Sequence, residues 1–196
     1  AEGYRNPSFR EMYLYRSANP ELDPERMMNY EVTVGKTFSR YFSMDVTGYY
    51  SKGDNLIQTV DMKNENAGRF INKGIEVSAS SRPIDKLNLR ASYSYLHTSL
   101  DNLTAAPRNQ YFWGLGWQVL PKLKMDAELK GIGGLYVSNQ TEHQKYVLLN
   151  MKITYMAFRA LELFVTLNNI TNIGYMINRG YTMPGFNGMG GLKVHF

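Results

Sequence analysis

The sequence contains no cysteine, and its 196 residues include only three histidines. The absence of cysteine excludes a disulfide scaffold and any thiolate metal site. His97, His143 and His195 are isolated from one another and lack the spacing of zinc ligands, so we expect no metal and no cofactor. Neither a nucleophile elbow nor a phosphate-binding glycine loop is present. We therefore expect no catalytic residues and no enzymatic activity.

Two further features are missing. No stretch reaches the roughly 18 consecutive apolar residues that indicate a transmembrane helix. The net charge of +5 comes from 22 Lys and Arg against 17 Asp and Glu, spread in mixed signs along the chain. A nucleic-acid interface needs clustered positive charge, so no nucleic acid is expected as a partner. The low mean hydropathy of −0.39 leaves a membrane location open, because barrel strands are only half apolar.

What the sequence does contain is strict alternation, best seen in residues 123–131. Leu123, Met125, Ala127 and Leu129 alternate there with charged residues. Successive side chains of a strand point to opposite faces, whereas a helix would spread these apolar residues around its whole circumference. The same pattern recurs, in full or shortened, at residues 30–38, 42–50, 75–81, 87–95, 111–119, 147–155, 161–168 and 192–196. The period predicts about nine strands and no convincing helix.

The predicted connections alternate between short and long. The short ones are residues 39–41, 83–86, 120–122 and 157–160, and each holds an Arg or a Lys. The long ones are residues 61–68, 99–108, 138–145 and 170–187, and one long strand is expected over residues 42–60, interrupted near 53–55. Transmembrane β-barrels place all their short turns at one end. We therefore predict an antiparallel up-and-down meander with these four turns together. One apolar face should hold Leu87, Leu89, Ala91, Leu123, Met125, Ala127, Leu161, Leu163 and Val165.

Four segments give the chain a specific resemblance to the barrel of TonB-dependent outer-membrane receptors. Residues 4–13 (Tyr-Arg-Asn-Pro-Ser-Phe-Arg-Glu-Met-Tyr) resemble the family's Arg-Ala-Pro-Ser-Phe-x-Glu-Leu-Tyr stretch, with Asn6 for the usual Ala. Residues 19–31 resemble its Asn-Pro-x-Leu-x-Pro-Glu…Asn-Tyr-Glu signature, although Asp23 replaces a more frequent Lys. Residues 72–76 (Asn-Lys-Gly-Ile-Glu) are similar to a strand opening of the family. Residues 168–172, Pro184-Gly185 and the terminal Phe196 are similar to its closing block.

This resemblance implies an all-β fold in which residues 1–196 form the C-terminal part of a 22-stranded transmembrane barrel, with about nine to ten strands. The plug domain, the N-terminal strands and the TonB box are expected to be absent from this chain. The implied function is TonB-dependent uptake of a scarce nutrient, such as an iron–siderophore complex, across the outer membrane of a Gram-negative bacterium. The implied partners are that nutrient, TonB through the absent plug segment, outer-membrane lipid and lipopolysaccharide, and the outer-membrane assembly machinery.

The resemblance also suggests site residues. Gly191, Val194 and Phe196 resemble the family's assembly signal, an amphipathic last strand that ends in an aromatic residue. An exposed strand edge is a template for pairing, so an insertion machine can read such a strand by strand addition.

In the loop 170–187, Tyr175, Asn178, Arg179 and Tyr181 are candidates for ligand contact. A membrane-interface girdle is the competing interpretation for Tyr175 and Tyr181, as it is for Tyr136 and Tyr146, and Trp113 and Trp117 should share the lipid side. Asp126 and Glu128 lie between Lys124 and Lys130, which is typical of a solvated charge ladder and not of an acid–base pair.

Two other readings remain open. A small self-contained outer-membrane barrel would pair its first strand with its last. A soluble β-sheet ligand-binding module would bury its apolar faces in an interior. If the strands belong to a larger barrel, we expect an open curved sheet with free edges at residues 30–38 and 191–196. Such a sheet should self-associate or require detergent, because both its edges and its apolar face are exposed.

Overall fold

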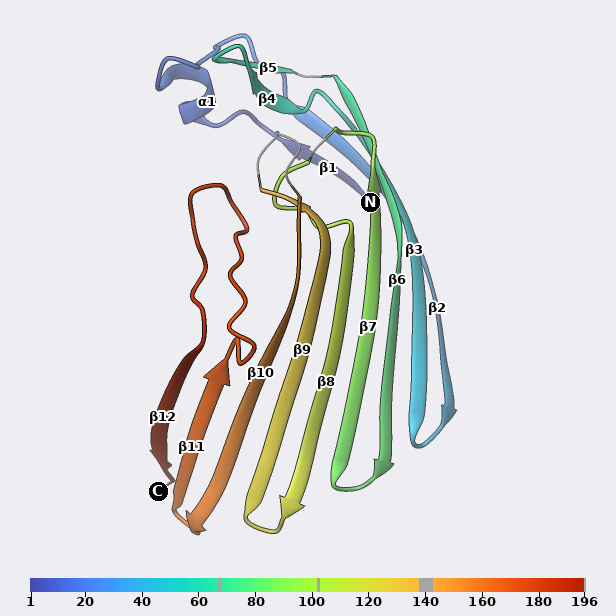
Figure 1. The fold of residues 1–196 in the computed structure, drawn as a ribbon. Helices are drawn as coiled ribbons and strands as arrows, with labels where there is room; N and C mark the ends of the chain where they lie inside the picture. Colours follow the sequence, from blue (N-terminus) through green and yellow to red (C-terminus); the bar gives the residue numbers. More distant parts are fainter. Residues whose placement is uncertain (67, 102, 138–142, 196) are drawn as a thin grey trace. The chain divides into compact units, whose positions relative to one another are not determined.

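The computed structural model describes residues 1–66, 68–101, 103–137 and 143–195. Within these ranges ten strands form one antiparallel sheet in the order β1-β2-β3-β6-β7-β8-β9-β10-β11-β12, and β4 pairs with β5 in a separate hairpin (Figure 1). The all-β meander of about ten strands is therefore confirmed. The elements are β1 (Glu2–Arg5), α1 (Phe9–Tyr13), β2 (Glu25–Ser39), β3 (Phe42–Asp54), β4 (Ile57–Val60), β5 (Lys63–Asn66), β6 (Arg69–Ile84), β7 (Leu87–Thr98), β8 (Asn109–Leu120), β9 (Leu123–Tyr136), β10 (His143–Phe158), β11 (Leu161–Asn168) and β12 (Asn187–Val194).

The chain folds into two compact units. Unit 1 comprises residues 1–32, 48–74 and 97–101, and unit 2 comprises residues 33–47, 75–96 and 102–196. Unit 2 contains the whole of the strands β8, β9, β10, β11 and β12. Unit 1 contains β1, α1 and the β4–β5 hairpin, and these carry the polar site described below.

The four short turns lie at the same end of the strands in unit 2 (Figure 1). Each is a two-residue connection, at residues 40–41, 85–86, 121–122 and 159–160. Two-residue loops fit antiparallel neighbours, because they let the chain return directly alongside the strand it has left. The predicted up-and-down topology is confirmed.

The register of unit 2 places the apolar residues on one face. Leu87 lies opposite Trp117, Trp117 opposite Met125, Met125 opposite Ile153, and Ile153 opposite Val165. Directly opposed residues of an antiparallel pair point to the same side of the sheet. We call this side the apolar face and the other the polar face. All nine residues predicted to share one face lie on the apolar face, and so does Trp113, which lies opposite Ala91.

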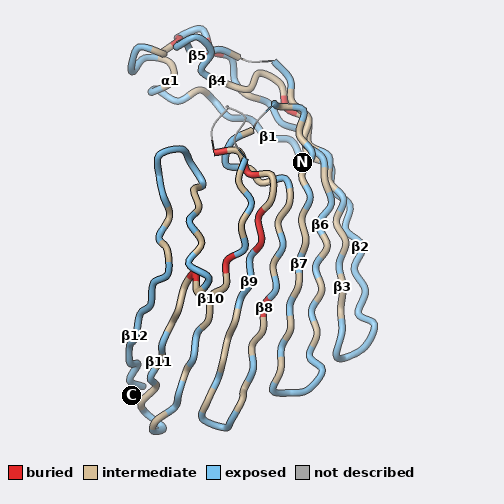
Figure 2. The backbone as a smooth tube through the Cα atoms, in the orientation of Figure 1, coloured by how far each residue is buried: buried red, intermediate tan, exposed pale blue. Residues whose placement is uncertain are grey.

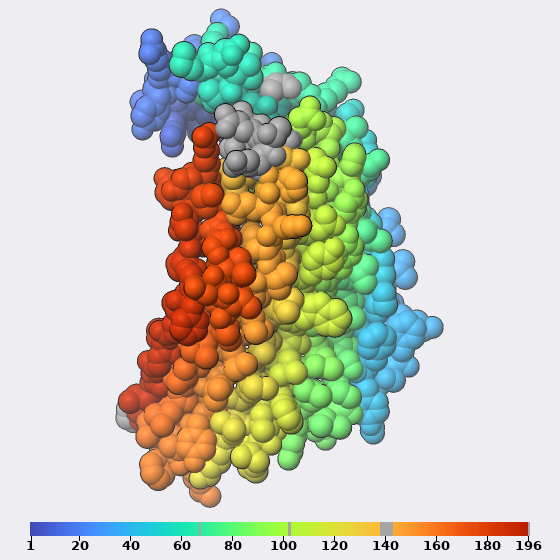
Figure 3. Space-filling view, in the orientation of Figure 1, coloured from blue at the N-terminus to red at the C-terminus, as the bar shows by residue number. Residues whose placement is uncertain are grey.

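Among the described residues of unit 2, no second layer covers the apolar face. Trp113 is 62% exposed and Val165 is 47% exposed. The buried apolar side chains of the described residues are Leu22, Ile132, Leu135, Val137 and Leu148. In unit 2 they gather on β9 and β10, toward the ends that carry the long connections (Figure 2). In the space-filling view the neighbouring strands of unit 2 present one continuous surface of side chains (Figure 3). This arrangement contradicts the soluble module, which requires a buried apolar interior.

The local predictions for residues 42–68 were partly right and partly wrong. The interruption predicted near residues 53–55 is confirmed, because β3 ends at Asp54 and Asn55 adopts a positive φ of 61° that turns the chain. The chain then forms the β4–β5 hairpin, whose turn residues Asp61 and Met62 have φ values of 45° and 65°. The loop expected at residues 61–68 therefore contains the strand β5.

The sequence analysis also missed β1 and α1. Strand β1 pairs with β2 from Glu25 to Met28, so β1 and not residues 30–38 begins the sheet. In the strand order, β2 lies between β1 and β3. Helix α1 has five residues, and none of the described residues belongs to a helix long and apolar enough to cross a membrane.

Candidate functional site

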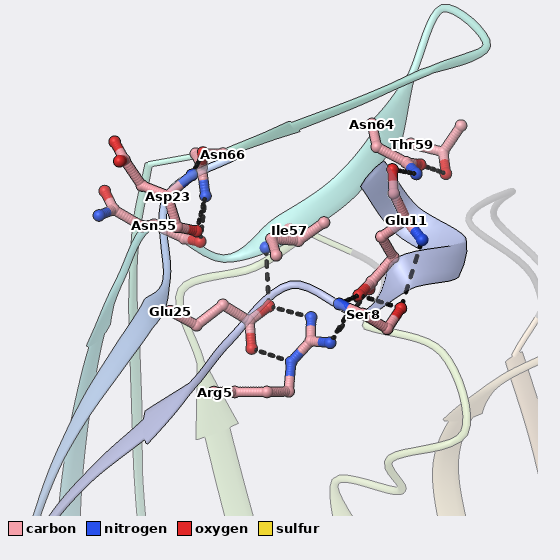
Figure 4. A network of polar contacts seen from close by, with 10 residues as sticks. All are labelled: Arg5, Ser8, Glu11, Asp23, Glu25, Asn55, Ile57, Thr59, Asn64 and Asn66. Carbon is pink, nitrogen blue, oxygen red and sulfur yellow. Dashed lines mark hydrogen bonds and ion pairs between the residues drawn. The ribbon is translucent and has the colours of Figure 1, made fainter. Parts of the chain in front are cut away.

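Unit 1 is organised around the guanidinium of Arg5 (Figure 4). Its Nη1 lies 3.0 Å from a carboxylate oxygen of Glu11 in α1, and its Nη2 lies 2.7 Å from a carboxylate oxygen of Glu25 at the start of β2. The Glu25 carboxylate also accepts the backbone N–H of Ile57 at 2.8 Å. One cation thus joins β1, α1 and β2, and reaches β4 through Glu25. We call Arg5, Glu11 and Glu25 the Arg5 cluster.

The segment 4–13 folds this way because of Ser8. Its hydroxyl accepts the N–H of Glu11 at 3.3 Å, while the Glu11 carboxylate accepts the N–H of Ser8 at 2.8 Å. These reciprocal bonds form a capping box, which satisfies two N–H groups at the start of a helix. The Ser8-x-x-Glu11 spacing was visible in the sequence and is the signal by which the helix could have been found.

The ion pairs of the cluster shift its acid–base equilibria. The hydrogen bonds from Ser8, and after them Arg5, hold the pKa of the Glu11 carboxyl below its usual range. The hydrogen bond from Arg5 does the same to the pKa of Glu25, against a smaller opposing effect of burial. Glu25 in turn raises the pKa of Arg5. Both carboxylates are therefore ionised at neutral pH, and the cluster carries two negative charges on one positive charge.

Three asparagines fasten the β4–β5 hairpin to the loop 14–24. The Asn64 amide donates to the Glu11 carbonyl at 3.0 Å, and the Asn19 amide donates to the Asn64 carbonyl at 2.8 Å. The Asn66 amide donates to the carbonyls of Asp23 and Asn55 at 3.0 and 2.8 Å. Asn19 and Asn64 are buried. The structure thus brings together residues 4–13 and 19–25, which the sequence presented as two separate motifs.

Beside these contacts, α1, the residues after it and the β4–β5 hairpin line a cavity of about 300 Å³ within unit 1 that is partly open to solvent. Its lining consists of Arg10, Glu11, Leu14, Tyr15, Ser17, Ile57, Gln58, Thr59 and Asn64. The sequence analysis named none of these residues as a site, because the lining comes from segments about forty positions apart in the printed sequence.

Asn169 holds the connection between β11 and β12, which we call the closing loop (residues 169–186). Its amide donates to the carbonyls of Ile173 and Pro184 at 2.9 and 3.1 Å, and its side-chain oxygen accepts the Ile173 N–H at 3.0 Å. Its own N–H donates to the Asn150 side chain at 2.9 Å. The side-chain oxygen of Asn172 accepts the N–H of Phe186 at 2.8 Å. The motifs 168–172 and 184–185 therefore meet across this loop.

The four loop residues suggested for ligand contact do not belong to the lining of the unit 1 cavity. The Tyr175 ring packs on the Tyr146 ring with centroids 4.5 Å apart. The backbone N–H of Arg179 donates to the Val137 carbonyl at 2.9 Å, and that of Tyr181 donates to the Asn178 carbonyl at 3.2 Å. Tyr181 is 74% exposed.

The girdle interpretation is wrong for Tyr146. Tyr146 lies opposite Ile132, on the polar face, because Val147 and Leu149 next to it belong to the apolar face. Its ring therefore serves to pack the closing loop through Tyr175. Asp126 and Glu128 also lie on the polar face, where Lys124 pairs with Asp126 at 2.9 Å. Within the described ranges no three His, Cys, Asp or Glu side chains are grouped as a metal site.

Two of the suggested assembly residues, Gly191 and Val194, lie on β12, whose neighbour in the strand order is β11. Gly191 lies opposite Phe164, and a Cβ at this position would come 2.5 Å from the Phe164 ring. The glycine therefore leaves room for that ring, over which the Lys152 ammonium lies at 5.1 Å. Val194 is 45% exposed on the apolar face opposite Leu161. Phe196 lies outside the described residues.

A comparison with known families matches residues 1–170 to the family described as "TonB dependent receptor-like, beta-barrel". The chain belongs to this family. Its members are receptors and transporters of the Gram-negative outer membrane, not enzymes, and they bind nutrient ligands such as siderophores and interact with TonB. The resemblance drawn from the four sequence segments is thereby confirmed.

One curated relative is similar to the chain in sequence, and two solved structures are similar to it in fold. The chain is 26% identical over 199 aligned positions to the vitamin B12 transporter BtuB of Photobacterium profundum, covering 92% of this chain and 32% of the relative. The solved copper transporter OprC superposes with a TM-score of 0.79 at 13% identity, over 100% of this chain and 37% of that one. The siderophore receptor PirA from Pseudomonas aeruginosa gives 0.76 at 15% identity, over 98% and 35%. The chain spans about a third of the length of these relatives.

Proposed function

We propose that the protein works in TonB-dependent uptake of a scarce nutrient, with an iron–siderophore complex as the first candidate. The observation that carries the proposal is the uncovered apolar face, with the short basic turns at one end of its strands and family membership to interpret it. Outer-membrane barrels carry an apolar band toward lipid and keep their short turns at the periplasmic end. Siderophore receptors among the structural relatives support the choice of ligand.

Within that function, residues 1–196 contribute barrel wall and outer loops as the C-terminal part of a larger barrel. The one-third share of the relatives' length supports this division. The plug, and with it the contact to TonB, belongs to the remainder of such a receptor. The apolar face is the surface for lipid and lipopolysaccharide. Gly191 and Val194 of the edge strand β12, together with the terminal Phe196, are the signal for the assembly machinery. Tyr175, Asn178, Arg179 and Tyr181 are the proposed ligand contacts of the closing loop.

Transport is tested by uptake of a radiolabelled ferric siderophore into Gram-negative cells that lack their own receptor for it. Cells that express the receptor containing this chain should accumulate the label, and they should stop doing so when TonB is deleted. Equal accumulation with and without TonB would contradict energised uptake. Equal accumulation with and without the receptor would exclude the tested siderophore as its ligand.

Cobalamin is the second candidate, favoured by the 26% identity to a vitamin B12 transporter. Radiolabelled cyanocobalamin in the same cells distinguishes the two. If the first candidate is correct, an excess of unlabelled cobalamin should leave siderophore uptake unchanged. Uptake of cobalamin without uptake of the siderophore would instead identify cobalamin as the ligand.

A further inference from the structure

We propose that the cavity of unit 1 is a binding site for a small carboxylate anion, with Arg10 as the residue that recognises it. The inference rests on the proposed uptake function, because it specifies the chemical class of ligand that one site of the receptor would bind. A cavity of about 300 Å³ lies at the lower end of the range for ligand pockets, so the ligand is small.

Arg10 is the cation of the lining. Within the described residues no carboxylate lies at ion-pair distance from its guanidinium, which is over the Tyr15 ring at 5.0 Å from the centroid. A cation–π contact of this kind attracts the guanidinium to the ring and does not consume its N–H groups as hydrogen-bond donors. A carboxylate can accept two parallel hydrogen bonds from the edge of a guanidinium.

Glu11, the acidic residue of the lining, should not repel a bound anion strongly, because its carboxylate forms an ion pair with Arg5. The Glu11 carboxylate is turned toward Ser8 and Arg5, with oxygen–nitrogen distances of 2.8 Å to the Ser8 N–H and 3.0 Å to Arg5 Nη1 (Figure 4). Among the charged side chains that line the cavity, Arg10 is therefore the one without a counter-charge.

The remaining lining separates into engaged and free polar groups. The Thr59 hydroxyl donates to the Asn64 side chain at 2.8 Å, and the Asn64 amide donates to the Glu11 carbonyl, so these groups fix the wall. The side chains of Ser17 and Gln58 have no hydrogen bond with the described residues. Their hydroxyl and amide are available to a hydroxyl or a second carboxylate of the ligand, which favours a hydroxycarboxylate over a simple fatty acid.

Tyr15 provides an independent indication of function. It adopts a φ of 72°, in the left-handed region that non-glycine residues rarely occupy, while its side chain is 72% exposed. An exposed tyrosine gains little packing that would compensate for such a backbone, whereas Asn or Gly would fit it without strain. Strained positions of this kind cluster at ligand sites. The ring that Tyr15 presents is the one that holds Arg10.

The test is calorimetric titration of citrate into the protein in detergent micelles, with neutral glucose as the matched probe. Citrate should bind and glucose should not. Arg10→Gln should weaken citrate binding at least tenfold, and Arg16→Gln, an exposed arginine outside the lining, should leave it unchanged. Unchanged citrate affinity in Arg10→Gln, or glucose binding as tight as citrate binding, would overturn the proposal.

Tyr15→Asn separates binding from folding. Asparagine tolerates a positive φ, so the variant should unfold at the same or a higher temperature, yet it should bind citrate several-fold more weakly because Arg10 loses its ring. Full affinity in this variant would refute the role of Tyr15. Failure of citrate binding with siderophore uptake intact would reject this site and leave the proposed transport standing.

Discussion

At the scale of single residues, the family motifs of this chain mainly fix the local backbone conformation and packing. Ser8 and Glu11 begin a helix, Asn169 and Asn172 fasten the closing loop, and Gly191 makes room for a ring. Each role follows from a property of one residue type: a short acceptor side chain, an amide that also tolerates positive φ, or the absence of a Cβ.

Gly191→Ala tests the last of these roles. The new methyl group would approach the Phe164 ring to 2.5 Å, so the ring must move, and we expect a loss of about 1–3 kcal/mol in unfolding free energy. The measurement is denaturant-induced unfolding in detergent micelles. Gly190→Ala on the same strand is the control, because its nearest neighbour is a backbone oxygen at 3.7 Å. The double variant Phe164→Ala, Gly191→Ala should show no further loss from the glycine change, and equal losses in both glycine variants would contradict the explanation.

At the scale of elements, the Arg5 cluster fastens the β4–β5 hairpin through charges that depend on pH. The pKa values of Glu11 and Glu25 are lowered in the folded protein, so the stabilisation is complete above their ordinary pKa of 4.5. It is lost as the pH falls through the lowered folded-state values.

We therefore expect the Ile57 amide, which donates to Glu25, to lose hydrogen-exchange protection as the pH falls below about 4. The measurement is exchange followed by mass spectrometry, with protection corrected for the intrinsic rate at each pH. Glu25→Gln should reduce protection at neutral pH and flatten this dependence. The amides of β11, which has no part in the cluster, serve as the reference. A pH dependence that persists in Glu25→Gln would assign the effect to other groups.

The edge strand β12 gives a second prediction at this scale. Deletion of Phe196 should block outer-membrane insertion of the receptor and leave its export to the periplasm intact, because the machinery reads an amphipathic strand with an aromatic end. The measurement is cell fractionation with detection of the receptor in each compartment. Phe196→Tyr, which keeps an aromatic end, should insert normally. Normal outer-membrane levels of the deletion variant would count decisively against the signal.

At the scale of the whole molecule, the sheet of unit 2 separates its two faces so that each needs a different environment. Ile153 belongs to the apolar face, and its neighbour Thr154 belongs to the polar face, opposite Lys124 and Phe164. Because the faces alternate residue by residue, neighbouring substitutions report on opposite environments.

Ile153→Arg and Thr154→Arg form a matched pair on this basis. If the apolar face meets lipid, Ile153→Arg should destabilise the barrel in lipid vesicles by about 2–4 kcal/mol, the cost of Arg at the middle of the bilayer. Thr154→Arg should cost much less, because its side chain faces the polar side. Equal losses from the two variants, measured by unfolding in vesicles, would show that the apolar face is not lipid-exposed. The expected self-association without detergent stays a prediction.

The long regular strands were predictable and unit 1 was not. Strands such as β7, β9 and β11 alternate over most of their length, and one buried or lipid-facing side fixes that pattern locally. Unit 1 depends instead on contacts between distant positions, as in the bonds from Asn64 to Glu11 and from Arg5 to Glu25. The interruption near Asn55 was predicted, but the departure of the following residues from the main sheet into the β4–β5 hairpin was not.

The sequence alone thus determined the strand periods, the four short turns, the apolar face and, through its motifs, the family. These properties are local or repeat along the chain, so neighbouring residues suffice to specify them. Tertiary structure decided where Tyr146 and Tyr175 meet, what Gly191 leaves room for, and that Arg10, Tyr15 and Gln58 share one cavity. Those contacts depend on how loops return in space, and in an open sheet with few buried side chains they rest on individual hydrogen bonds and ion pairs, which no periodicity records.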